Sequence, residues 1–149
     1  MKKKEAVFIG VLIIIIIIVV VIGAFRNNSK DETQQPNVYY EVFEDGTKLN
    51  YSPELHKDKT YNGLKISNIQ LTEKDGKSVL LADVTNTETT STNGFTTMDI
   101  TFYDDTGNAL GVTVGLIKPL APGETTELNA SLTFDYASAY DFKVTEHKE

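Results

Sequence analysis

Residues 98–116 read MDITFYDDTGNALGVTVGL, and this stretch indicates most directly which fold the chain adopts. Apolar residues alternate with polar or small residues in both halves, and the turn-forming cluster DDTGN stands between them. A period of two is typical of a half-buried β-strand, so the stretch predicts a strand, a turn and a second strand. The alternating apolar side chains are expected to face the core: Met98, Ile100, Phe102, Leu110, Val112, Val114 and Leu116.

The same period continues on both sides of this stretch. Upstream, strands are predicted around residues 64–71 and 78–84, joined by Asp75-Gly76, a dipeptide that favours a type I′ hairpin turn. The apolar positions change parity between Ile66 and Ile69, which predicts a β-bulge. The nearly all-apolar strand at 78–84 is expected to be buried on both faces. Downstream, two further strands are predicted from the alternation of Leu128, Ala130, Leu132 and Phe134 and then of Tyr140, Phe142 and Val144.

This pattern favours an all-β fold. Strands spaced about eight to ten residues apart, without a crossover helix, are typical of an Ig-like antiparallel β-sandwich of about seven strands. Its core is expected over residues 60–146. A single short turn is predicted at Ser52-Pro53-Glu54-Leu55, because serine caps a helical turn and proline suits its first position. Residues 38–43 are either a first strand or an extension of the segment before them.

The N-terminal part of the chain predicts one transmembrane helix. Residues 6–25, AVFIGVLIIIIIIVVVIGAF, carry no charge and are long enough as a helix to cross a hydrocarbon core of roughly 30 Å. Lys2, Lys3 and Lys4 precede them, and basic flanks stay in the cytoplasm, so the C-terminal part is expected outside. A cleaved signal peptide is the alternative, although its apolar core is usually shorter, about 7–15 residues. A lipoprotein is excluded, because the chain has no cysteine to carry the lipid.

These patterns divide the chain into four parts. We expect a cytoplasmic stub at 1–5, a transmembrane signal anchor at 6–25, a flexible polar stalk at 26–37 and the sandwich domain at 38–149. Small extracellular eukaryotic domains usually rely on disulfides, so a cysteine-free domain outside the cytoplasm favours a bacterial surface protein.

The charge of the chain limits its partners. Beyond residue 25, eleven Lys and Arg residues stand against twenty Asp and Glu residues, a net charge of −9. An acidic domain repels nucleic acid and anionic lipid headgroups, so nucleic acid is not an expected partner. The membrane is expected to be contacted through the single anchor.

Three short motifs carry a resemblance to a known family. Ile100-Thr101-Phe102-Tyr103-Asp104, followed by Gly107, resembles the FxLYD motif of bacterial surface Ig-like domains, with Ile and Phe in place of the motif's Phe and Leu. Val84-Thr85-Asn86 and Pro122-Gly123-Glu124 stand where these families have Val-x-Asn and Pro-Gly-Glu. The segment from Tyr61 to Ile66 is similar to the start of the related telokin-like domains. The resemblance implies an extracytoplasmic β-sandwich module and names no activity.

The chemistry-bearing residues do not assemble into a recognisable catalytic set. The only histidines are His56 and His147, and they lie in charged segments far apart in the sequence. With no cysteine there is no Cys–His pair, and no zinc spacing or phosphate loop occurs. We therefore predict no enzyme activity, no catalytic or cofactor-binding residues, no cofactor and no metal site. Asp104, Asp105 and Asn108 could offer oxygens to calcium, but the EF-hand spacing is not met and turn chemistry accounts for them better.

Tyrosines are the remaining candidates for a contact surface. Tyr39, Tyr40, Tyr51 and Tyr61 precede the main strands, and exposed aromatic residues often form interfaces. The alternative, which we favour, is that they cover an open end of the sandwich.

The function expected from the sequence is therefore a non-enzymatic binding or scaffolding module at the bacterial cell envelope. Its partner would be an envelope protein or a cell-wall polymer. A small-ligand or cation sensor acting with a membrane partner is the alternative. Its weakness is the stub at 1–5, which is too short to carry a signalling domain.

Overall fold

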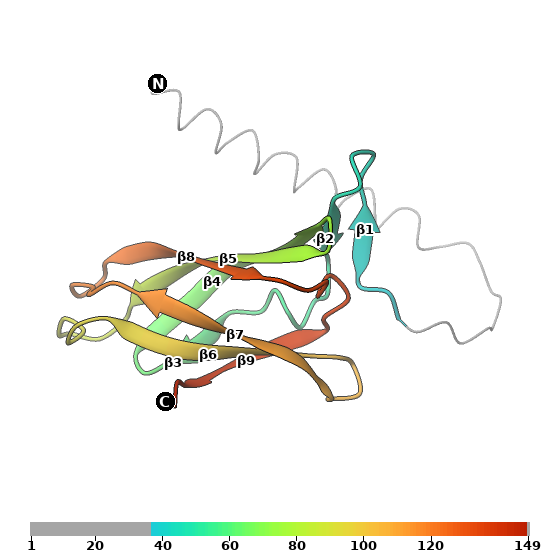
Figure 1. Ribbon diagram of the computed structural model, residues 1–149. Helices are drawn as coiled ribbons and strands as arrows, with labels where there is room; N and C mark the ends of the chain where they lie inside the picture. Colours follow the sequence, from blue (N-terminus) through green and yellow to red (C-terminus); the bar gives the residue numbers. More distant parts are fainter. Residues whose placement is uncertain (1–36, 149) are drawn as a thin grey trace, which may run out of the picture. The chain divides into compact units, whose positions relative to one another are not determined.

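The computed structural model describes residues 37–148 as nine β-strands in two antiparallel sheets, with no helix among these residues (Figure 1). The all-β prediction is therefore confirmed. The strands are β1 Tyr40–Val42, β2 Lys48–Asn50, β3 Lys59–Tyr61, β4 Leu64–Lys74, β5 Lys77–Asn86, β6 Thr96–Tyr103, β7 Ala109–Ile117, β8 Thr125–Leu132 and β9 Asp141–Glu146.

The predicted stub and transmembrane anchor lie outside the described residues, as does the stalk apart from Asn37. Within residues 37–148, no helix is long and apolar enough to span a membrane.

The larger sheet has the order β1-β2-β4-β5-β8, with β3 also pairing with β4, and the smaller sheet has the order β7-β6-β9. The β4–β5 hairpin closes at Asp75 and Gly76, whose φ angles of 54° and 78° are those that a type I′ turn requires. The register of β4 against β5 shifts between Ser67 and Gln70, where Asn68 has a φ of 51°. The predicted turn and the predicted bulge are both confirmed.

The core lies between the two sheets, and most of its large side chains were expected there. The residues that each strand contributes alternate with half-buried or exposed ones. The largest fully buried side chains are Phe102, Phe142, Leu55, Leu64, Ile66, Leu71, Leu80, Met98, Ile100, Ile117, Leu120 and Leu128. The Phe102 ring is stacked on that of Tyr136, with the ring centres 5.5 Å apart, and is tilted against that of Phe142 at 6.0 Å.

The segment before the main strands belongs to the larger sheet. Residues 40–42 form β1, which pairs with β2 in the register Tyr40↔Asn50 to Val42↔Lys48. Of the two possibilities open for residues 38–43, the structure therefore shows the strand. The expected turn covers residues 53–56 directly after Ser52, with His56 N donating to Ser52 O at 3.3 Å, and Leu55 within it is fully buried.

The prediction that β7 buries its alternating aliphatic residues is wrong. Leu110, Val112, Val114 and Leu116 are 39–60% exposed, whereas the intervening Gly111, Thr113, Gly115 and Ile117 face the core. The register confirms this orientation, because Gly111 pairs with the buried Phe102 and Gly115 with the buried Met98.

The space beside β7 explains why its glycines turn inward. A Cβ on Gly111 would lie 1.9 Å from the hydroxyl oxygen of Tyr136, and a Cβ on Gly115 would lie 3.1–3.2 Å from Ile100, Leu128 and Met98. Large side chains from β6, β8 and the following loop already fill the core at these positions. Only glycine fits against them at positions 111 and 115, so the face that carries Gly111 and Gly115 turns inward and the aliphatic face points to solvent.

Two smaller expectations also need correction. Phe134 continues the alternation of β8 in sequence, but β8 ends at Leu132 and Phe134 is 66% exposed. On β5, Leu80, Ala82 and Val84 are buried, whereas Val79 and Leu81 on the opposite face are only half-buried. β5 lies between β4 and β8 in its sheet, and only the face that carries Leu80, Ala82 and Val84 points into the core. The face that carries Val79 and Leu81 points away from the core and is only partly covered.

Candidate functional site

The most unusual surface of the described residues is the outer face of β7. We call Leu110, Val112, Val114 and Leu116 the β7 stripe; their exposed fractions are 39%, 60%, 48% and 59%. No ionisable residue lies between Asp105 and Lys118, although the chain beyond residue 25 has a net charge of −9. Because contiguous exposed apolar side chains cost solvation free energy, an uncharged stripe on an acidic domain is a candidate binding surface.

The stripe is confined to the edge of its sheet. β7 pairs with β6 and, among the described strands, with no other. On β6 the residues opposite the stripe are Thr97, Asp99 and Thr101. The Asp99 carboxylate contacts His147 Nδ1 at 2.7 Å, so the neighbouring part of this face is polar. The apolar area therefore follows one strand rather than covering the face of the sheet.

The four tyrosines that were predicted to form a contact surface make contacts within their own chain. The Tyr39 ring lies 5.1 Å from that of Tyr140, and the Tyr39 hydroxyl donates to the Asp105 carboxylate at 3.2 Å. Partial burial and this carboxylate raise the pKa of Tyr39. The Tyr51 hydroxyl donates to Val38 O at 2.5 Å. These contacts fit the alternative that the tyrosines cover an end of the sandwich.

The other two tyrosines also have intramolecular partners. Lys48 Nζ lies 5.2 Å from the centre of the Tyr40 ring, and Tyr61 on β3 packs against the hydrophobic core. A role in binding stays a prediction for all four.

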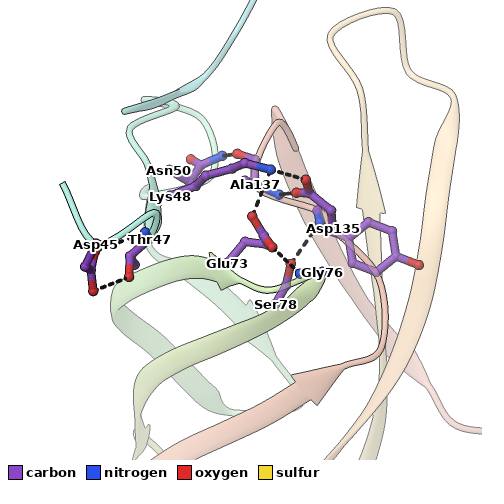
Figure 2. Close-up of polar contacts among 10 residues, drawn as sticks. Asp45, Thr47, Lys48, Asn50, Glu73, Gly76, Ser78, Asp135 and Ala137 are labelled. Carbon is purple, nitrogen blue, oxygen red and sulfur yellow. Dashed lines mark hydrogen bonds and ion pairs between the residues drawn. The ribbon is translucent and has the colours of Figure 1, made fainter. Parts of the chain in front are cut away.

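A polar cluster missed by the sequence analysis lies under the β1–β2 hairpin (Figure 2). Lys48 on β2 forms an ion pair with Glu73 on β4 at 2.8 Å and a second one with Asp135. Glu73 is only 3% exposed, and its carboxylate also accepts from Gly76 N at 2.6 Å. The hydrogen bonds to Asp135 and then to Glu73 raise the pKa of Lys48, so this amine stays charged.

Neighbouring hydrogen bonds show that this cluster holds segments together. Asn50 Nδ2 donates to Ala137 O at 2.6 Å and to Ala139 O at 2.7 Å, and Tyr136 N donates to Ser78 Oγ at 2.8 Å. These bonds join β2 and β5 to the segment between β8 and β9. Glu73 could have been anticipated, because it shares the inward parity of Ile69 and Leu71, but parity alone does not identify Lys48 as its partner.

The acidic turn between β6 and β7 uses its own oxygens. Asp104 Oδ1 accepts from Thr106 Oγ1 at 2.7 Å, Asn108 N at 2.8 Å and Thr106 N at 3.0 Å. These hydrogen bonds, first that from the Thr106 side chain and then that from Asn108 N, lower the pKa of Asp104 to about 2. The turn interpretation is confirmed. In the described part of the chain, no three His, Cys, Asp or Glu residues are grouped so as to hold a metal ion.

A polar hollow of about 280 Å³ lies at the opposite end of β6, beside the loop that joins β5 to β6. Its lining residues carry amide, hydroxyl and carboxylate groups: Asn62, Asn86, Glu88, Thr90, Ser91, Thr92, Asn93 and Thr96. The Asn86 amide is already engaged, since its Nδ2 donates to Thr90 O at 2.8 Å and its Oδ1 accepts from Glu88 N at 2.9 Å. The Thr92 hydroxyl is engaged as well, because it accepts from Leu120 N at 2.9 Å. The other polar side chains of the lining could bind a small polar ligand.

The two histidines make separate local contacts. His56 Nδ1 lies 2.7 Å from the backbone oxygen of Ser52, whose own hydroxyl donates to Tyr140 O. His147 contacts Asp99. The structure therefore uses the Ser52 hydroxyl in a backbone hydrogen bond rather than in a Ser–His pair.

The three sequence motifs have structural positions. Asn86 N donates to Glu124 O at 3.0 Å, and Gly123 N donates to Asn86 O at 2.9 Å. Asn86 Nδ2 also donates to Leu120 O at 3.1 Å. The Val-x-Asn and Pro-Gly-Glu segments thus bind each other, while Ile100 and Phe102 are buried. These motifs therefore stabilise the fold.

Comparisons with known proteins give little beyond this description. No family model matches the chain. No curated protein matches it either. The structure is similar to the crystal structure of a DUF1425 family member from Shewanella sp. pv-4, with a TM-score of 0.39 and 13% sequence identity over 74% of this chain and 97% of that one. A likeness at this level carries no argument about function.

Proposed function

We propose that this chain is a non-enzymatic binding or scaffolding module with an Ig-like fold, held by one N-terminal anchor on the outer face of a bacterial cell membrane. The observation that carries the binding role is the β7 stripe, four aliphatic side chains exposed on the edge strand of an acidic domain. A partner that covered the stripe would remove apolar surface from water, at about 25 cal/mol per Å².

The strand order supports the Ig-like assignment. The sequence β4-β5-β8 in one sheet and β7-β6-β9 in the other corresponds to the order A-B-E and C′-C-F of Ig-like sandwiches. The FxLYD resemblance agrees with it, because its residues occupy the buried face of the central strand β6 and the turn that follows.

The location rests on residues 2–25. Three lysines precede an uncharged apolar run of transmembrane length, which favours a cytoplasmic N-terminus and an extracytoplasmic domain. The partners reachable there are envelope proteins and cell-wall polymers. Protease treatment of intact cells tests this topology: the domain should be digested, and its survival until lysis would contradict the proposed orientation.

The binding role is tested by site-specific photocrosslinking of the full chain on intact cells. A photoreactive amino acid at Val114 should give discrete crosslinked products, whereas one at Val42 should not. Val42 is a matched control, because it is also an exposed valine, at 56%, but lies on β1 of the other sheet. Equal labelling from both positions, or no product from Val114, would contradict a binding role for the stripe.

A sensor of a small polar ligand or cation is the second candidate, and the hollow beside Asn86 is the observation that favours it. Calcium at millimolar concentration should then raise the melting temperature of the full chain. An unchanged melting temperature would count against cation sensing.

A further inference from the structure

The exposed strand β7 has a symmetric sequence. Residues 110–116 read LGVTVGL, which is the same in both directions about Thr113. The inward glycines are explained by the core, since Tyr136 fills the space at Gly111, and Ile100, Leu128 and Met98 fill it at Gly115. The core does not explain why the outward positions are aliphatic, nor why they are symmetric.

We propose that two copies of this chain associate through β7, with the two β7 strands paired antiparallel about a twofold axis at Thr113. This rests on the proposed function, because it names a partner for the strand that carries the β7 stripe. In this register Leu110 lies opposite Leu116 of the second copy, Val112 opposite Val114, and Gly111 opposite Gly115. Twofold association requires one surface to be complementary to itself, and a palindromic strand meets that requirement along its whole length.

The edge of β7 is suited to such pairing. β7 hydrogen-bonds to β6 on one side, and the described backbone hydrogen bonds include none from β7 to β8. β8 lies near the inner face of β7, where Thr113 Oγ1 and Ser131 O are 3.5 Å apart. A strand added in the plane of the smaller sheet would therefore satisfy the unpaired main-chain groups of β7, as in β-strand addition.

The side chains favour this arrangement as well. Residues directly opposite each other on antiparallel strands share a face, with Cβ atoms about 4.5–5.5 Å apart. The two stripes would merge into one continuous patch of Leu–Leu and Val–Val pairs, in which each side chain shields its neighbour. An unprotected aliphatic edge strand invites uncontrolled association, and pairing with a second copy closes it.

The distribution of charge around β7 favours a second copy over the other possible partners. The symmetric register brings no like charges together, because no ionisable residue lies between Asp105 and Lys118, and Lys118 would lie opposite Asn108, beside the acidic turn of the second copy. The net charge of −9 disfavours an anionic lipid surface; a second copy carries the same charge, but its contact in this register is made by the uncharged stretch between Asp105 and Lys118. Packing of two sheet faces is disfavoured because β6 presents Asp99 and threonines beside the stripe.

Disulfide trapping tests the register directly, because the full chain has no cysteine. Val112→Cys and Val114→Cys chains, mixed in detergent micelles and mildly oxidised, should form the mixed disulfide in clear excess over either homodimer. The mixed pair is directly opposite, whereas like pairs are diagonal at roughly 7–8 Å, beyond ordinary disulfide reach. Val42→Cys should crosslink weakly with every variant. Mixed and homodimeric products in statistical proportion would overturn the proposal.

The oligomeric state of the full chain in micelles gives an independent test by light scattering. Val114→Lys should weaken dimerisation by about tenfold or more, because two ammonium groups would face the apolar patch, whereas Val42→Lys should not. A thermal melt shows whether Val114→Lys still folds, and Val114→Thr repeats the test with a neutral side chain. A dimer that persists in both Val114 variants would overturn the proposal.

These results separate the two proposals. If Val114 crosslinks to other proteins or to a polymer but never to a second copy, the binding role stands and self-pairing is wrong. If Val114 captures nothing on cells and nothing in micelles, both are wrong. Binding to vesicles of anionic lipid that is lost in Val114→Lys would assign the stripe to the membrane instead and would also overturn self-pairing.

Discussion

β6 and β7 are neighbouring strands of one hairpin, and they use the same pattern in opposite ways. Both alternate apolar residues with polar or small ones. On β6, Met98, Ile100 and Phe102 are completely buried. On β7 the aliphatic stripe is exposed, and Gly111 and Gly115 face the core instead. Alternation thus establishes that a strand has two different faces. Which face is buried depends on the volume available beside the strand.

The largest expected difference between β6 and β7 comes from truncating one side chain on each strand to alanine. Phe102→Ala removes a fully buried ring that contacts Tyr136 and Phe142, and it should destabilise the fold by about 3–5 kcal/mol. Val112→Ala on the exposed face of β7 should change the free energy of unfolding by no more than about 0.5 kcal/mol. Urea denaturation of both variants in the same detergent checks this. Equal losses would mean that the β7 stripe is buried.

The next effect tests whether the glycine face of β7 is packed. Gly111→Ala places a Cβ where the Tyr136 hydroxyl lies, at 1.9 Å, and so displaces this ring from Phe102. We expect a loss of about 1–3 kcal/mol, as for other overpacked cores. Gly115→Ala should cost less, because the nearest side-chain atoms would lie 3.1–3.2 Å from the new Cβ rather than 1.9 Å. A stabilising Gly111→Ala substitution would show that this face is open.

These positions also show what the sequence could and could not predict. The bulge at Asn68 and the Asp75-Gly76 turn follow from local rules, because parity and positive φ are set by neighbouring residues. The inward side of β7 depends on Tyr136, which lies beyond β8, and on Leu128 within it. Such packing between distant segments is not encoded in the period of one strand.

The candidate site was missed for the same reason. The period of residues 110–116 predicts that their aliphatic side chains face the core, so the sequence alone indicates no exposed binding surface there. The tyrosines were noticed by residue type, but their partners are a carboxylate, a backbone oxygen, a lysine and the core, all on distant segments. The two glycines four residues apart on one face of β7, Gly111 and Gly115, are the signal that could have identified the opposite, aliphatic face as the exposed one.

A smaller effect concerns the turn that joins the two strands. The Asp104 carboxyl has a pKa of about 2 in the folded protein, below its ordinary value of 3.8, because Thr106 and Asn108 donate to it. Its contribution to stability is therefore complete above about pH 4 and is lost as the pH falls to about 2. Asp104→Asn should reduce stability at pH 7, and its difference from the unmodified chain should shrink over this pH range.

Urea denaturation between pH 7 and pH 2 measures this pH dependence. Glu127→Gln is the matched control, because Glu127 is an exposed carboxylate on β8 away from the turn, and its curve should run parallel to that of the unmodified chain. A constant difference between Asp104→Asn and the unmodified chain at every pH would show that the carboxylate charge is not what stabilises the turn.

The smallest expected effect on folding is that of a valine-to-threonine substitution on an exposed strand face. The same substitution on a buried strand face serves as the comparison. Val114→Thr replaces an exposed methyl group by a hydroxyl that water can solvate, so the free energy of unfolding should change by no more than about 0.5 kcal/mol. Val84→Thr makes the same change at a fully buried position and should cost about 1–3 kcal/mol, because the hydroxyl is desolvated. Denaturation at a protein concentration low enough to keep the chain monomeric isolates this intrinsic effect. If Val114→Thr destabilised the monomer as much as Val84→Thr does, the stripe would be part of the core, and both proposals for it would lose their basis.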